Sequence, residues 1–157
     1  MKVLPILAMM AVGGPGAAWA AGGVHAHDLT ITGAVMRATP PGVSTTAGYL
    51  VIVNAGAKAD MLRSVSCSCA GMVMLHATIM HMGMATMTTP GEIVIPAHGE
   101  ARLAPGGYHL MIMGLKAAPK DGSTQPVTLR FEHAGTVVVP FAVNARIAAE
   151  PAMPMHH

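Results

Sequence analysis

Short runs of β-branched residues, interrupted at close intervals by Pro, Gly and Asn, restrict this chain to a β-fold. The turn signals are Pro40-Pro41-Gly42, Asn54-Ala55-Gly56, Pro90-Gly91, Pro105-Gly106-Gly107 and Lys120-Asp121-Gly122. Nine strand candidates lie among them, at residues 29–35, 48–54, 61–66, 72–80, 92–95, 101–103, 108–115, 127–133 and 136–143. Turns at this density favour a β-sandwich or closed barrel. Since no stretch shows a convincing 3.6-residue period, we expect an all-β single domain.

Alternation along two of these segments separates aliphatic side chains from sulfur and imidazole. In segment 72–80, the two-residue period of a strand places Met72, Met74, His76, Thr78 and Met80 on one face. The other face carries Val73, Leu75, Ala77 and Ile79. In segment 108–113, His109, Met111 and Met113 share one face, opposite Tyr108, Leu110 and Ile112. We expect the two segments to form two walls of one site.

The first twenty residues have the pattern of a secretory signal. Lys2 precedes an apolar run at 3–12, and Ala18-Trp19-Ala20 forms a small-x-small cleavage site. The apolar run is shorter than the roughly 20 residues that span a bilayer, and no later stretch approaches a membrane span. We therefore expect a signal peptide at 1–20 and a protein exported to an oxidising compartment, which the family resemblance given below implies is the periplasm. Its expected parts are a flexible segment at 21–27, a folded domain at 28–147 and a Met- and His-bearing tail at 148–157.

The charge balance excludes some partners and directs attention to soft donor atoms. Nine Lys and Arg against seven Asp and Glu give a net charge of +2, which is too small to indicate binding of nucleic acid or an anionic lipid surface. By contrast, the chain has 15 Met and 9 His but only 2 Cys. Thioether and imidazole chemistry is therefore the distinctive property of this sequence.

Four of these residues form a candidate soft ligand set. Ten residues separate His76 from Met87, twenty-one separate Met87 from His109, and one separates His109 from Met111. Two neutral imidazoles and two thioethers form an uncharged ligand set that suits Cu(I) better than zinc, calcium or magnesium. A thioether also cannot be lost to a disulfide outside the cytoplasm, and it carries no proton to displace. The sequence predicts a Cu(I) site at these four residues.

The spacing H-x10-M-x21-H-x-M resembles the hallmark of the periplasmic Cu(A) chaperone family, PCuAC. Flanking residues are similar too, namely Arg37-Ala38-Thr39-Pro40-Pro41-Gly42, Ala47-Gly48-Tyr49 and Pro105-Gly106-Gly107-Tyr108-His109-Leu110-Met111. The resemblance covers about residues 28–143. It implies a cupredoxin-like Greek-key β-sandwich or barrel, Cu(I) ligands at His76, Met87, His109 and Met111, and copper delivery toward the Cu(A) centre of cytochrome c oxidase. The implied partner is a copper acceptor, such as cytochrome c oxidase subunit II or another copper chaperone.

Other soft donors receive different interpretations. We expect Met72 and Met74 to fill space in the core, as strand-embedded Met usually does. His81, Met82 and Met84 are expected in a loop before Met87, where they could ligate copper weakly and transiently. His98 and His133 are expected to be solvated. The tail residues Met153, Met155, His156 and His157 form an auxiliary donor set for copper, with Cu(II) at the imidazoles as one option.

Cys67-Ser68-Cys69 departs from the family pattern, in which this loop more often carries Ser and Pro. Three interpretations are open, namely a labile redox pair, auxiliary copper ligands or small buried side chains. A disulfide between residues so close in sequence closes a tight, easily reduced ring. We favour burial as thiols or such a bridge over a primary role in copper binding.

A copper carrier competes with three other functions. Blue-copper electron transfer needs a Cys thiolate beside two His, but both cysteines here precede His76. No hydrolase, metalloprotease or phosphate-binding motif occurs, so we expect no enzymatic activity. The best enzymatic alternative is a thiol-disulfide reductant that uses Cys67 and Cys69. The remaining alternative is copper storage or resistance, which binding of several ions per chain would indicate.

Histidine ligation predicts that Cu(I) affinity depends on pH. Imidazole binds copper only when neutral, and the side chain has an ordinary pKa of about 6.5, so affinity should weaken as pH falls below roughly 6. Competition titrations against a Cu(I) chelator between pH 7 and pH 5 would measure this. An affinity that stays flat across that range would contradict ligation by His76 and His109.

Overall fold

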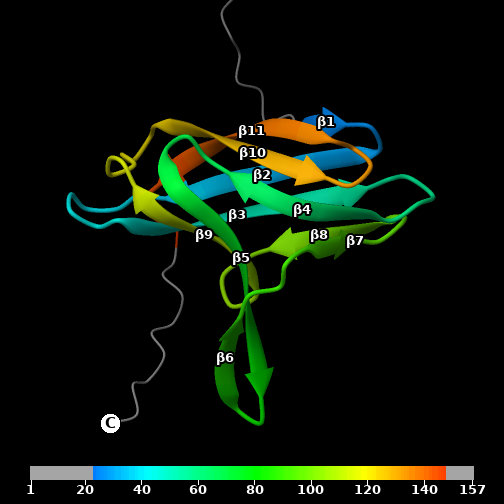
Figure 1. Cartoon of the computed structure of the whole chain (residues 1–157), viewed down its shortest axis with the longest axis horizontal. Coiled ribbons are helices and arrows are strands. Elements are labelled where there is room, and N and C mark those ends of the chain that lie inside the picture. Colours follow the sequence, from blue (N-terminus) through cyan, green and yellow to red (C-terminus); the bar gives the residue numbers. More distant parts are fainter. Residues whose placement is uncertain (1–22, 148–157) are drawn as a thin grey trace, which may run out of the picture.

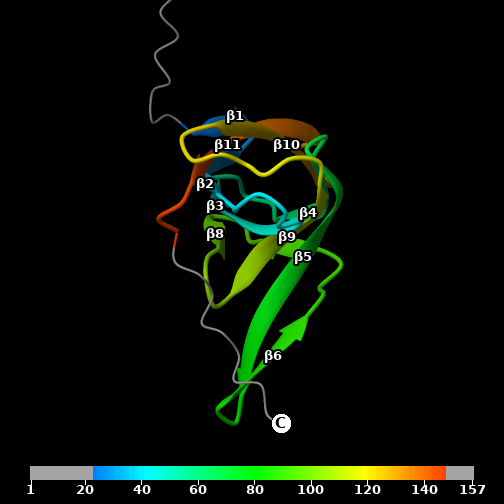
Figure 2. The same cartoon turned by 90° about the vertical axis from the view of Figure 1, so that its left-hand side faces the viewer.

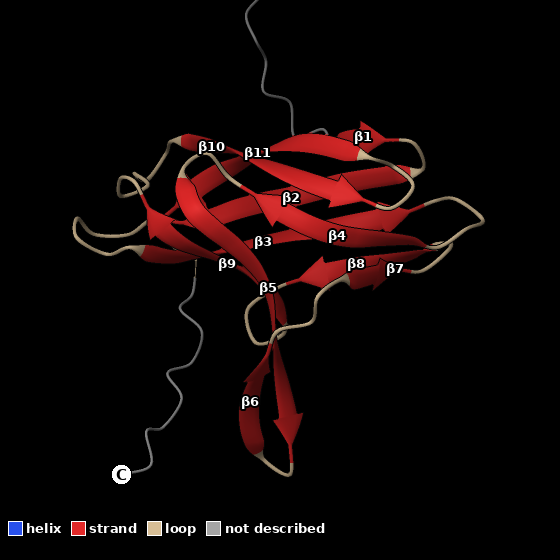
Figure 3. Ribbon diagram, viewed as in Figure 1, coloured by secondary structure: helices blue, strands red, loops and turns tan. Residues whose placement is uncertain are grey.

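The computed structural model describes residues 23–147, which form eleven β-strands and no helix (Figures 1 and 3). The strands are β1 (Val24–Ala26), β2 (Leu29–Arg37), β3 (Thr45–Asn54), β4 (Asp60–Ser66), β5 (Ala70–His81), β6 (Met84–Thr88), β7 (Ile93–Ile95), β8 (Gly99–Leu103), β9 (Tyr108–Leu115), β10 (Thr124–Phe131) and β11 (Thr136–Asn144). Residues 23–147 therefore include no helix of the length and apolarity that crossing a membrane requires.

The strands form one continuous sheet that bends round on itself. Their order is β6-β5-β9-β8-β3-β2-β11-β10-β4-β7, and β1 pairs with β2. Contacts of β4 with β5 and of β7 with β8 bring distant parts of that order together, so the sheet encloses a core. Figure 2 shows β10 and β11 at one side of the body and β5 and β9 at the other. The all-β fold expected from the turn spacing is confirmed.

Aliphatic side chains from alternate strand positions fill the core. Fully buried side chains include Leu50, Ile52, Leu110, Ile112, Leu129 and Phe141. Each such residue stabilises the fold by about 1.5–3 kcal/mol through burial of apolar surface. Gly48 of β3 faces this cluster, where a Cβ would lie 3.3 Å from the Phe141 ring and 3.4 Å from Ile112 Cδ1. The small residue lets β3 pack closely beneath Phe141.

All nine expected strands are present, with ends that differ by up to three residues. Two short strands were missed, β1 and β6, and both are corrections. Residues 24–26 pair with β2 instead of lying outside the folded body at 21–27. The expected loop at His81 to Met84 shrinks to Met82 and Gly83, because His81 ends β5 and Met84 begins β6. Only Thr86 and Thr88 of its five residues favour strands, so pairing with β5 rather than composition accounts for β6. The expected signal at 1–20 and tail at 148–157 lie outside the described residues.

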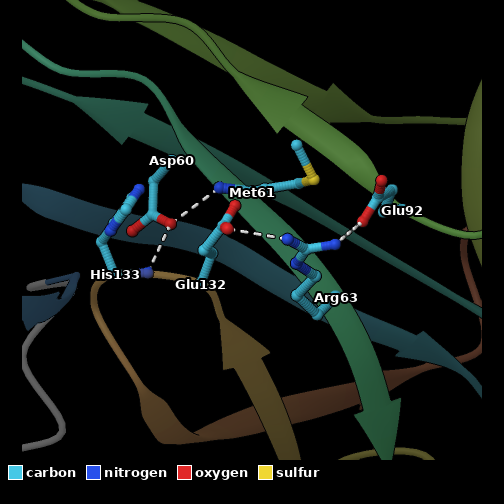
Figure 4. Close-up of polar contacts among 6 residues, drawn as sticks. All are labelled: Asp60, Met61, Arg63, Glu92, Glu132 and His133. Carbon is cyan, nitrogen blue, oxygen red and sulfur yellow. Dashed lines mark hydrogen bonds and ion pairs between the residues drawn. The ribbon is translucent and has the colours of Figure 1, made fainter.

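A buried carboxylate ties the start of β4 to the turn between β10 and β11 (Figure 4). Asp60 Oδ1 accepts hydrogen bonds from the backbone N–H of Met61 at 2.7 Å and of His133 at 2.9 Å. Its Oδ2 accepts a third from Ala134 at 2.9 Å. Burial is the largest influence and raises the pKa of Asp60, but these donors and the His133 charge together hold the pKa below its ordinary value. Asp60 is therefore ionised at neutral pH, and its carboxylate holds the turn in place.

Arg63, two positions after Met61 on the exposed side of β4, carries two ion pairs. Its guanidinium binds Glu132, at 2.7 Å, and Glu92. These carboxylates raise the pKa of Arg63, with the Glu132 hydrogen bond as the main cause. All three side chains are well exposed, so the network adds little stability. Arg63 also lines a surface pocket together with Met74 and Leu75 of β5.

Asp60→Asn should lower the free energy of unfolding by about 1–3 kcal/mol, because one of the three backbone N–H groups would then face an amide NH₂. Chemical denaturation at neutral pH would measure the loss. The stabilisation by a carboxyl whose pKa is lowered on folding is present above the unfolded pKa of about 3.9 and is lost as pH falls through the folded value. The difference between wild type and variant should therefore shrink below about pH 4.

Asp121→Asn is the matched control for this substitution. Asp121 Oδ1 accepts one hydrogen bond, from the Ala145 N–H at 2.8 Å, and an Asn oxygen can accept the same bond. Equal destabilisation by the two variants would show that the three-donor arrangement at Asp60 is unimportant.

Candidate metal centre

The two predicted imidazole ligands are directly opposite each other in neighbouring strands. His76 of β5 pairs with His109 of β9 in the antiparallel register. Their ring centroids are 5.6 Å apart, and the ring planes are inclined by 66°. Opposite residues of an antiparallel pair have Cβ atoms about 4.5–5.5 Å apart, so the pairing by itself brings both rings to one place.

Met87 approaches the same pair from the third strand. It lies in β6 opposite Thr78 of β5, and is therefore a diagonal neighbour of His76, two residues away on the same face. Its Sδ is 3.2 Å from His76 Nδ1. Residues eleven positions apart in sequence are thus in contact through a two-residue hairpin turn, and the structure brings three of the four predicted ligands together.

The fourth predicted ligand, Met111, shares the face of His109. It lies two residues further along β9, about 7 Å by the rise of a strand. It is half-buried, between Met74 of β5 and Ala47 of β3 in the register. A Met side chain has three rotatable bonds and adapts to irregular spaces. Met111 therefore lies beside the imidazole pair on the same surface of the sheet.

A tight turn orients the His109 ring. Pro105 and Gly106 are the central residues of a turn closed by the Gly107 N–H and the Ala104 carbonyl at 3.0 Å, and Gly106 has a φ of 84°. Pro followed by a residue with positive φ is the type II pattern, which favours Gly. The Gly107 carbonyl then lies 3.1 Å from His109 Nδ1 and also accepts the Thr78 N–H at 3.1 Å. With the proton on Nδ1, the lone pair for a metal is on Nε2.

Exposure and charge describe a soft site that opens on one side. His109 is fully buried, whereas Met87 is 40% exposed. The segments 70–91 and 104–115, which contain all four predicted ligands, have no Asp, Glu, Lys or Arg. Nor do any three His, Cys, Asp or Glu side chains within 23–147 gather as a metal site would require. The donors on this face are therefore imidazole and thioether.

The other predicted donors have mixed outcomes. His98 and His133 are exposed, as expected. The expectation that Met72 fills the core is wrong, because its side chain is 55% exposed at the outer end of the β5–β9 ladder. Met74 is half-buried and faces Met111. Sequence reasoning passed over this Met74–Met111 pairing, although the alternation of both segments contains it. The auxiliary donors Met153, Met155, His156 and His157 lie outside the described residues.

Cys67 and Cys69 form a disulfide just before β5 begins. Cys67 is 9% exposed and Cys69 packs against the core, which agrees with the favoured interpretation of a bridge. His76 lies six residues after Ala70, the first residue of β5, which is about 20 Å along an extended strand. With both sulfurs bonded to each other and so far away, they contribute no thiolate to the site at His76.

The same fold occurs in solved copper-protein structures. The copper-bound PCuAC domain from PmoF2 superposes with a TM-score of 0.68 at 24% identity, over 78% of this chain and 97% of that domain. Apo-DR1885 from Deinococcus radiodurans is 32% identical, with a TM-score of 0.61 over 94% of this chain and 97% of that one. Its Cu(I) form is 31% identical, with a TM-score of 0.62 over 80% and 82%. The class defined by this fold is the cupredoxin-like PCuAC domain.

Comparison of the amino-acid sequence with known families identifies the family of this chain. The family described as "LpqE-like: Putative lipoprotein LpqE-like" matches residues 29–143, and the chain belongs to it. A relative in Leifsonia xyli subsp. xyli (strain CTCB07), "Putative lipoprotein Lxx21020", is 35% identical over 121 residues, which is 75% of this chain and 72% of the relative. The resemblance to PCuAC proteins seen in the sequence is confirmed.

Met87→Leu and Met111→Leu should each weaken Cu(I) binding at least about tenfold, since even outer-shell changes at metal sites cost 10- to 100-fold. Leu is close to Met in volume, so the fold should be retained. Chelator competition and thermal unfolding of the copper-free variants would measure the two properties. Met72→Leu is the matched control on the same face, and equal weakening by it would contradict the assignment.

Proposed function

We propose that this protein is an exported copper carrier that holds one Cu(I) with His76, Met87, His109 and Met111. The observation that carries the proposal is the convergence of His76, Met87 and His109 from three neighbouring strands, with the Met87 sulfur 3.2 Å from the His76 ring. The two imidazoles fix the position of the ion, and the two thioethers favour its reduced form.

The ligand environment fits a carrier better than a permanent metal centre. Four neutral donors leave the bound ion with its single positive charge, and segments 70–91 and 104–115 contain no carboxylate that would attract a hard cation. The exposed Met87 leaves a side of the site from which an acceptor can reach the ion. An acceptor with thiolate ligands would then bind the ion more strongly and withdraw it.

Similar proteins support two parts of the proposal, namely that the cargo is copper and that the protein is exported. DR1885 has a solved Cu(I)-bound form and is 31% identical to this chain in that structure. The family is described as one of lipoproteins, which agrees with the signal pattern at residues 1–20. We infer that the mature protein acts in the periplasm and passes copper toward the Cu(A) centre of cytochrome c oxidase, through subunit II or another copper chaperone. The tail at 148–157 would supply an auxiliary site, with Cu(II) at His156 and His157 as one form.

X-ray absorption of the Cu(I)-loaded protein tests the ligand set directly, because it counts sulfur and nitrogen neighbours. Two nitrogen and two sulfur donors per copper are expected at one equivalent. A sulfur-only or nitrogen-only environment would refute the four-residue site. Saturation with several tightly held ions in the body of the chain would favour the alternative function of copper storage or resistance.

The disulfide separates the carrier from the remaining alternative, a thiol-disulfide reductant. Because Cys67 and Cys69 are about 20 Å from His76 along β5, the variant with Ser at both positions should bind Cu(I) with wild-type affinity. It should also transfer Cu(I) to a reduced copper-free Cu(A) domain, as followed by the purple Cu(A) absorption after oxidation. The proposal fails if the double variant binds Cu(I) normally but no longer metallates a prereduced acceptor.

Met87→Leu is the counterpart in the same transfer assay. A carrier requires this ligand, whereas a reductant acting on an oxidised acceptor does not. The carrier is therefore supported when the Met variant loses transfer and the Cys variant keeps it. In a parallel assay that starts from an oxidised Cu(A) domain, loss of activity in the Cys variant alone would identify the disulfide as the functional group.

A further inference from the structure

The β5–β6 hairpin extends beyond the body of the protein and carries a second set of soft donors. Pairing of β5 with β9 ends at Ala77 and Tyr108, and the Thr78 N–H still donates to the Gly107 carbonyl, so residues 79–81 pair only with β6. Figure 1 shows the hairpin projecting alone from the body. Near its tip, Met80, Met82 and Met84 are 64%, 92% and 68% exposed. These thioethers do not pack against the core.

The turn at the tip has an unusual residue for its conformation. Met82 and Gly83 connect the strands with φ values of 49° and 79°. Positive φ at both central positions is the type I′ hairpin, which favours Asn-Gly or Asp-Gly. Met in the left-handed region is conformationally unfavourable, and a side chain that is 92% exposed gains no packing in return. Local strain that the fold does not require is found preferentially at functional sites.

The neighbours of Met82 make a ligand set with it. His81 and Met84 are directly opposite each other across the turn, so their Cβ atoms are about 4.5–5.5 Å apart on one face. An imidazole and two thioethers thus surround the tip, and no Asp, Glu, Lys or Arg occurs anywhere in 70–91. This is the donor chemistry of a Cu(I) site and not of a hard cation.

We propose that His81, Met82 and Met84 form a second, weaker Cu(I) site at the tip of the hairpin, where the ion is first captured. This inference rests on the proposed function, because that function identifies Cu(I) as the ion carried. Met80 lies on the opposite face of the hairpin from His81, the face shared by His76 and Met87. It pairs with Ala85, two residues from Met87, and so is within reach of that thioether. Met80 therefore lies between the tip and the site at His76.

Methyl NMR tests the inference residue by residue. The purified protein is labelled with ¹³C at the Met ε-methyl groups, each signal is assigned by a Met→Leu variant, and Cu(I) is added anaerobically in steps. Met87 and Met111 signals should shift with the first equivalent, and Met82 and Met84 signals with the next. The separate signals of Met153 and Met155 report on the tail, so copper bound there is not confused with copper at the hairpin.

Met82→Asn is the decisive variant, because Asn is favoured at this turn position while it removes the thioether. The hairpin should stay folded, as shown by unchanged cross-strand contacts of residues 78–81 with 84–87. The affinity for the second equivalent should fall by about tenfold or more. Met72→Thr, which removes another exposed thioether from β5, is the matched control and should leave that affinity unchanged.

The outcomes separate this inference from the proposed function. If Met87 and Met111 shift but Met82 and Met84 do not through three equivalents, the hairpin site is refuted and the carrier site stands. If Met82 and Met84 shift and Met87 and Met111 do not, the proposed function fails and the hairpin site stands. Equal weakening by Met82→Asn and Met72→Thr would also refute the hairpin site.

Discussion

The register between β5 and β9 is the constraint on which the rest of the molecule depends. It places Met72 opposite Met113, Met74 opposite Met111 and His76 opposite His109, while Leu75, Leu110 and Ile112 turn inward to the core. A slip of one residue would exchange the two faces of a strand. It would turn the His and Met side chains of that strand toward the core and its Leu side chains away from it, and both the core and the donor face would be lost together. The hydrophobic effect that folds the sheet thus also assembles the donors.

This coupling explains how a soft site can exist without the metal. The body is held by an aliphatic core and by anchors such as Asp60, which lie away from the donor strands. The His76–His109 pair is fixed by the strand ladder, and the Gly107 carbonyl fixes the orientation of His109. Because none of these interactions needs an ion, the fold does not depend on bound copper, which is what the proposed carrier requires when it cycles between loaded and empty forms.

Much of this arrangement could be predicted from the sequence. Turn residues at short intervals specified nine of the strands, and the two-residue alternation in 72–80 and 108–113 specified the donor face. The hairpin strand β6 could not be found in this way, because Met84 to Thr88 contains only two strand-favouring residues, Thr86 and Thr88, and pairs only with β5. The exposure of Met72 was also missed, since alternation says which face a residue occupies but not whether another layer covers that face. The contact of Met87 with His76 depends on the two-residue turn, and a longer loop would have fitted the sequence equally well.

The two halves of the donor set differ in mechanical character. His109 is enclosed and tied to a turn that also accepts the Thr78 N–H, whereas Met87 belongs to an edge strand bonded on one side only. Bending of the hairpin would therefore carry the sulfur away while the imidazoles stay in place. In the proposed carrier, departure of the ion should begin with the breaking of the Cu–S bond to Met87, with an incoming ligand approaching from the open edge of β6. The position of β6 at the edge of the sheet thus determines the side from which the incoming ligand approaches.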